Sequence, residues 1–60
     1  MEFKSIDEIN CSDKLRNIVD AMRMRDVRRF NQAKSEFKVA IEQASPRVAE
    51  KYRPLFDAVP

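Results

Sequence analysis

The sequence has no glycine, no histidine and no tryptophan, and it has a single cysteine. Without glycine, a turn that needs a positive φ has to use another residue, and we expect Asn or Asp there. β-Hairpins also lose their preferred turn residues, which argues against a β fold. Cys11 cannot form an internal disulfide, and too few Cys and His ligands remain for a zinc site. We therefore expect neither a bound metal nor another cofactor.

Long apolar runs are missing too. No stretch approaches the roughly 20 apolar residues that span a bilayer, and residues 1–10 carry three acids, unlike a secretory signal. A single unpaired thiol is typical of a reducing compartment. These features predict a cytoplasmic protein that does not bind membranes. With 60 residues, the chain makes at most one small domain, residues 1–60.

The residue patterns of common enzyme sites are missing as well. The sequence contains no glycine-rich phosphate loop and no Cys–His or Ser–His pair. Acid–base catalysis by carboxylates needs two of them to converge in a pocket that excludes water. A helical chain of this length has little room for a pocket of several hundred Å³. We expect a protein that is not an enzyme and has no small-molecule substrate.

The residues that are present favour helices. Leu, Ile, Val, Ala and Met recur among Lys, Arg, Glu and Gln, which predicts an all-α fold. Ser5-Ile6-Asp7-Glu8 has the pattern of a capping box and predicts a short helical turn over residues 6–10. Ser12-Asp13 resembles a second helix start. Ser45-Pro46 predicts the start of a last helix, and Pro54 predicts a kink or a restart within it.

The central segment, residues 13–44, contains neither proline nor glycine. At 100° per residue its apolar side chains form one stripe. The stripe consists of Leu15, Val19, Met22, Phe30, Ala33, Phe37, Ala40, Ile41 and Ala44. Two structures fit this pattern. One is a single helix of about 32 residues, roughly 48 Å long, which would have to dimerise to bury its stripe. The other is a helical hairpin turned near residues 23–26 and completed by residues 46–59 into a three-helix bundle.

Asp26 bears on the choice between the two structures, and burying it unpaired in a long helix would cost several kcal/mol. As an N-cap it would be followed by Arg28 and Arg29, which have the wrong charge for a first helical turn. Inside a continuous helix it could pair with Arg23 or Arg29, three residues away on either side. This favours the long helix and therefore a dimeric helical bundle.

A resemblance to a repeat family supports the hairpin instead. The run Phe30-x-x-Ala33-x-x-x-Phe37-x-x-Ala40-Ile41 resembles the second helix of a tetratricopeptide repeat. It covers about a quarter of the chain and occurs once, whereas arrays of this family need several repeats. The resemblance implies a helical hairpin and no particular function.

The charges are unevenly placed. Residues 14–38 hold eight bases and three acids. On a helix, Arg25, Arg28, Arg29 and Gln32 share the face opposite the apolar stripe, and Arg23 is close to them in the sequence. Arginine on such a face suits carboxylates and phosphates, which it binds through two parallel hydrogen bonds. Three apolar residues outside the stripe are candidate binding anchors: Met24, Leu55 and Phe56.

These patterns predict a small interaction protein that binds and modulates, for instance inhibits, a larger protein or assembly. Its arginine face would engage an acidic protein surface, and its apolar anchors would add affinity. In its small size and its lack of glycine, the chain resembles accessory proteins encoded by phages. The alternative is a dimeric regulator that binds nucleic acid through the same arginines.

Overall fold

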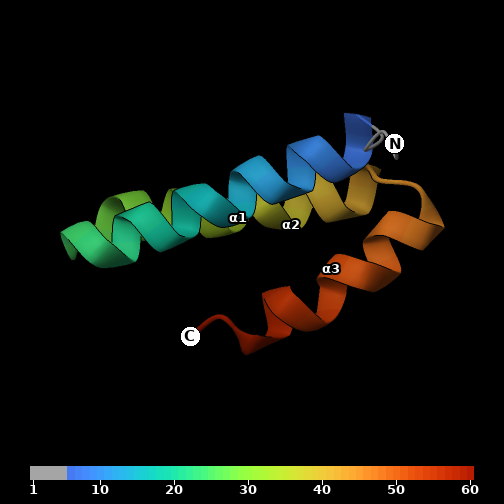
Figure 1. The fold of residues 1–60 in the computed structure, drawn as a ribbon. Coiled ribbons are helices and arrows are strands. Elements are labelled where there is room, and N and C mark those ends of the chain that lie inside the picture. Colours follow the sequence, from blue (N-terminus) through green and yellow to red (C-terminus); the bar gives the residue numbers. More distant parts are fainter. Residues whose placement is uncertain (1–5) are drawn as a thin grey trace.

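The computed structural model describes residues 6–60 and contains three helices in this part of the chain (Figure 1). They are α1 (Ile6–Met24), α2 (Val27–Gln43) and α3 (Pro46–Ala58). α1 and α2 form an antiparallel hairpin, and α3 packs mainly on α2. No strand occurs within residues 6–60, so the prediction of an all-α fold is confirmed there.

The central segment is not one long helix, and the preference for that structure was wrong. The chain turns at Arg25 and Asp26, as in the hairpin alternative. Asp26 is the N-cap of α2, and its Oδ1 accepts the backbone N–H of Arg29 at 3.1 Å. Such a cap contributes about 1 kcal/mol. The arginines that follow it are exposed, so their unfavourable interaction with the helix dipole is screened by water.

The N-terminal helix differs from the expectation as well. Ser5 lies outside the described residues, and α1 runs without a break from Ile6 through Ser12 and Asp13. A short turn over residues 6–10 followed by a second helix start at Ser12 is therefore wrong. Continuity places Cys11 on the same face of the helix as Ile18, seven residues later, and both side chains are buried.

α3 begins as predicted, with Ser45 as N-cap and Pro46 in the first turn. The helix continues through Pro54 to Ala58, so the predicted restart at Pro54 does not occur, and a kink there is not confirmed. Pro54 removes one donor to the carbonyl of Glu50, four residues back. Both residues are exposed, so water can satisfy that carbonyl.

The core lies where α2 meets its two neighbours. α2 buries most of its predicted stripe, with Phe30 half-buried, and the ring of Phe37 lies edge-on to Tyr52, with 6.2 Å between the ring centroids. The buried cluster consists of Cys11, Ile18, Ala33, Phe37, Ala40, Ile41, Val48, Ala49 and Tyr52. Small alanines among these residues allow a close approach of the helices.

The stripe predicted for α1 was partly wrong. Val19 and Met22 are exposed, whereas Ile18 and Ala21 are buried. The predicted stripe assumes that the helical phase continues unchanged from α2 into α1. Because the chain turns between the helices, the face that α1 buries is set by its contact with α2 and not by that phase.

Polar contacts tie α3 to the hairpin. Lys51 forms an ion pair with Glu8, and the backbone N–H of Ser45 donates to Oδ2 of Asp7 at 3.0 Å. At the other end of α3, Nζ of Lys34 donates to the carbonyl of Pro60 at 3.1 Å. The first seven residues of α2, about 10 Å of helix, therefore extend beyond this contact. Figure 1 shows the turn between α1 and α2 projecting past the end of α3.

None of the three helices, over the residues that the structure describes, combines the length and the apolar character that a bilayer crossing requires.

Candidate functional site

The turn between α1 and α2 is the most basic part of the described chain. We call residues 22–29 the hairpin tip. It holds four bases and one acid within eight residues. Nearly all of its side chains are exposed, namely Met22, Arg23, Met24, Arg25, Val27, Arg28 and Arg29. The hairpin tip thus combines uncompensated positive charge with exposed apolar side chains.

The backbone of the turn fixes this arrangement. The N–H of Arg25 donates to the carbonyl of Met22 at 3.2 Å, and the N–H of Asp26 donates to that of Ala21 at 3.1 Å. These two bonds are the Schellman pattern that ends many helices. Its left-handed position is occupied by Arg25, with φ of 54°. The expectation that Asn or Asp would fill such a position was wrong.

A left-handed arginine has an energetic cost. The Cβ atom makes this conformation about 1–2 kcal/mol less favourable for an ordinary residue. The rest of the turn compensates for it, because both backbone donors are satisfied and Asp26 caps the next helix. The result is a two-residue connection that holds an arginine at the outermost point of the hairpin.

The acid of the hairpin tip does not neutralise its arginines. Asp26 is occupied as the cap of α2. Within residues 6–60, none of the four arginine side chains forms an ion pair. Nη1 of Arg29 lies 3.4 Å from Sδ of Met24, so these two side chains lie against each other across the turn. The charge of the tip is therefore available to a partner.

The structure brings together most, but not all, of the predicted binding residues. Arg23, Met24, Arg25, Arg28 and Arg29 gather at the hairpin tip through the turn. Gln32 lies one turn further along α2, beside Arg29, in a shallow cavity of about 270 Å³ between α1 and α2.

Leu55 and Phe56 lie on α3 and are not part of the hairpin tip. Leu55 is 43% exposed. Phe56 is half-buried, with its ring centroid 6.0 Å from that of Phe37 and the Lys34 ammonium 5.7 Å from its own centroid. Packing contacts therefore cover most of the surface of the Phe56 side chain.

Sequence reasoning missed three exposed apolar residues near the tip. Val27 is 72% exposed, and Val19 and Met22 are 47% and 49% exposed. The stripe predicted over residues 13–44 included Val19 and Met22, whichever of the two structures the segment forms. Placing the turn at Arg25 would have revealed Val27, because the first turn of the second helix then lies at the end of the molecule.

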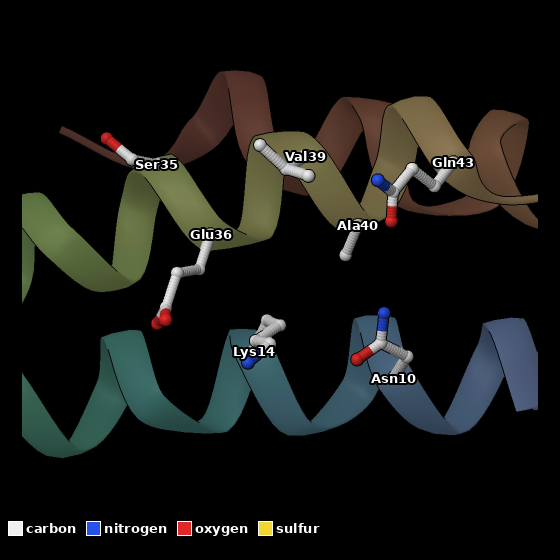
Figure 2. Close-up of a pocket in the computed structure, with 7 residues that line it drawn as sticks. All are labelled: Asn10, Lys14, Ser35, Glu36, Val39, Ala40 and Gln43. Carbon is white, nitrogen blue, oxygen red and sulfur yellow. The ribbon is translucent and has the colours of Figure 1, made fainter.

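The structure has surface cavities of several hundred Å³, so the expectation that a chain of this length has little room for them was wrong, but they offer little chemistry. Figure 2 shows one of about 320 Å³, with Glu36, Ala40 and Gln43 directed from α2 toward α1. Its other lining residues are Asn10, Lys14, Ser35 and Val39. The hydroxyl of Ser35 is directed away from Glu36, the one carboxylate of the lining. A larger cavity of about 730 Å³ between α2 and α3 is bordered by exposed charges, including Glu50, Arg53 and Asp57.

Potential metal ligands do not converge either. Over the described range, no group of three or more Cys, Asp or Glu side chains could hold an ion. The thiol of Cys11 is fully buried. Burial, together with the nearby Asp7 carboxylate, raises the pKa of this thiol, so it is a poor nucleophile and acts as a small core residue.

Comparison of the chain with protein-family models, with curated proteins and with solved structures gives no match, so the hairpin tip stands as the candidate site on its geometry and charge alone.

Proposed function

We propose that this chain is a small, non-enzymatic interaction protein that binds and modulates a larger protein or assembly through the hairpin tip. The observation that supports this most is the gathering of four exposed arginines that have no ion-pair partner within residues 6–60. Exposed Met24 and Val27 lie among them. Arginine and methionine are enriched in protein interfaces, and this mixture suits an acidic surface with apolar patches.

The arginines and the apolar residues contribute to different steps of binding. Positive charge concentrated at one end of the molecule steers it toward an acidic surface and raises the association rate. Paired hydrogen bonds from guanidinium to carboxylate then fix the orientation. Apolar contacts slow dissociation. A partner surface held in this way is closed to other molecules, which is the basis for modulation or inhibition.

Charge reversal combined with site-specific crosslinking tests this function. A photoreactive amino acid at position 27 is placed in the native sequence and in a variant with Arg25, Arg28 and Arg29 changed to Glu. We expect crosslinked partner to fall at least tenfold in the variant. The matched control changes Lys38, Arg47 and Arg53, which are exposed and outside the tip, to Glu and should retain the crosslink. Equal crosslinking by the tip variant would refute the proposal.

The alternative function is a dimeric nucleic-acid-binding regulator. One observation favours it, namely that Arg28, Arg29 and Gln32 occupy the first turns of α2, where guanidinium groups on exposed side chains can bind phosphate. Two copies would be needed to reach a useful number of phosphate contacts, so this form requires a homodimer.

A salt series separates the two functions. Phosphate binding predicts that log affinity falls linearly with log salt, with a slope of about −0.9 per contact on duplex DNA. Changing Arg25, Arg28 and Arg29 to Ala should then flatten the slope. Retention of a duplex that is unaltered by these changes would exclude the alternative, and sedimentation tests the dimer that it requires.

A further inference from the structure

At the hairpin tip and directly beside it, the two helices carry apolar side chains that α3 does not cover. Val19 and Met22 on α1 and Val27 on α2 are exposed, and Phe30 is half-buried at the edge of the core. We call these four residues the open face. They are continuous with the core through Phe30.

The open face lies on the side of the hairpin where α3 packs. On α1, Val19 and Met22 point within about 40° of Glu8, which pairs with Lys51 of α3. On α2, Val27 and Phe30 point within about 40° of Lys34, which reaches Pro60. The four residues therefore continue the side to which α3 binds, from Lys34 to the turn.

The charges around the open face are mainly positive, although Asp20 lies beside Arg16 and Arg23 on α1. Arg23 and Arg16 flank Val19 on α1, Lys34 flanks Phe30 on α2, and Arg25 closes the end. Asp26, the acid in the turn, is engaged as the cap of α2. A second copy of this chain would oppose like charges across a symmetric contact, which is unfavourable. An occupant that carries acids is favoured instead.

We propose that the open face binds an acidic amphipathic helix of the partner protein, in line with α3. The apolar stripe of that helix would cover the open face, and its flanking carboxylates would pair with Arg23, Arg25 and Lys34. Helices seated on such faces use anchors at i, i+3, i+4 and i+7. The inference rests on the proposed function and specifies the form of the partner.

Three peptides of 18 residues test the inference against the ¹⁵N-labelled full chain. The first has a leucine stripe at helical spacing with glutamates on both flanks. The second has the same stripe with lysines, and the third has the composition of the first with the stripe scrambled. We expect the first to bind at least tenfold more tightly than the other two and to shift the amides of the open face.

Variants connect the binding to these residues. Changing Met22 and Val27 together to Glu should weaken binding of the first peptide at least tenfold while the helical circular dichroism stays unchanged. Val39, equally exposed but outside the open face, is the control, and Val39→Glu should leave the affinity as it was.

Four results would overturn the inference. Equal binding of the scrambled acidic peptide, with shifts confined to the arginines, would exclude a seated helix and leave the proposed function standing. Equal binding of the lysine peptide would exclude charge recognition. Absence of binding by the first peptide would exclude the site. Shifts of the open face that grow with protein concentration alone would show that a second copy covers it.

Discussion

At the scale of single residues, Arg25 places a positive charge in the turn at the expense of stability. Arg25 has φ of 54°, a region in which glycine has no steric penalty. Strained backbone of this kind is concentrated at functional sites. An arginine in this position keeps a positive charge at the outermost point of the hairpin and costs stability. Removing the strain should therefore stabilise the fold.

We expect Arg25→Gly to raise the free energy of unfolding by about 1 kcal/mol, because glycine adopts the left-handed conformation without a Cβ clash. Urea denaturation followed by circular dichroism measures the change. Arg23→Gly is the matched control. Arg23 lies in the last turn of α1, where glycine should instead destabilise by about 0.5–1 kcal/mol. A loss of stability in Arg25→Gly would contradict the conformational argument.

Cys11 gives a prediction on pH. Its pKa in the folded state is raised by burial and by Asp7, so the folded protein holds this proton more tightly than the unfolded chain. Its contribution to stability is fully present below about pH 8.5, the ordinary cysteine pKa, and is lost as the pH rises through the folded-state pKa. Between pH 8 and 10 the free energy of unfolding should therefore fall more steeply in the native chain than in Cys11→Ala. Equal slopes would show that the thiol does not titrate differently in the two states.

At the scale of helices, α2 is the element on which the fold depends. α1 and α3 both pack on it and contact each other little. Phe37 is fully buried and touches the rings of Tyr52 and Phe56 on α3. A change at this position therefore affects the attachment of a whole helix.

Phe37→Ala should destabilise by about 3–5 kcal/mol, the usual range for a buried phenylalanine. A chain of 60 residues has little more than this in total. We expect the variant to lose its helical circular dichroism at 25 °C. Val39→Ala, on the exposed side of the same helix, should remain folded, and a folded Phe37→Ala would show that the core depends less on this ring than its burial implies.

Sequence patterns predicted those helices whose ends have local signals. Ser45-Pro46 marked the start of α3, and most of the stripe of α2 was predicted correctly. The turn at Arg25 was missed because it lacks glycine and because arginines follow Asp26. The position of the turn depends on the tertiary packing of α1 on α2, and rules based on local charge do not take that packing into account. The arginines were predicted as binding residues from their residue type, but their gathering at one end of the molecule depends on the turn at Arg25.

At the scale of the whole described chain, the molecule has two unlike ends. It measures 35 × 22 × 16 Å, with three helices at one end and only α1 and α2 at the other. The three-helix end holds the aromatic contacts and the Lys51–Glu8 ion pair. The two-helix end holds the hairpin tip and the open face.

Folding should not require a second chain. A long helix would have needed a twin to bury its stripe, whereas the hairpin buries the stripe of α2 within one chain. We expect the helical circular dichroism to be the same at 1 and 100 µM, whether or not folded chains then pair. A rise in helicity over this range would show that folding is coupled to association.

The limited reach of α3 has a consequence for hydrogen exchange. Amides near Met22 and Phe30 are shielded by one neighbouring helix, so they should exchange with solvent deuterium sooner than those near Phe37, which two neighbours shield. A partner bound at the two-helix end would shield these amides from solvent, as a second neighbouring helix does near Phe37. Slower exchange there would then report occupancy of the site even before the partner has been identified.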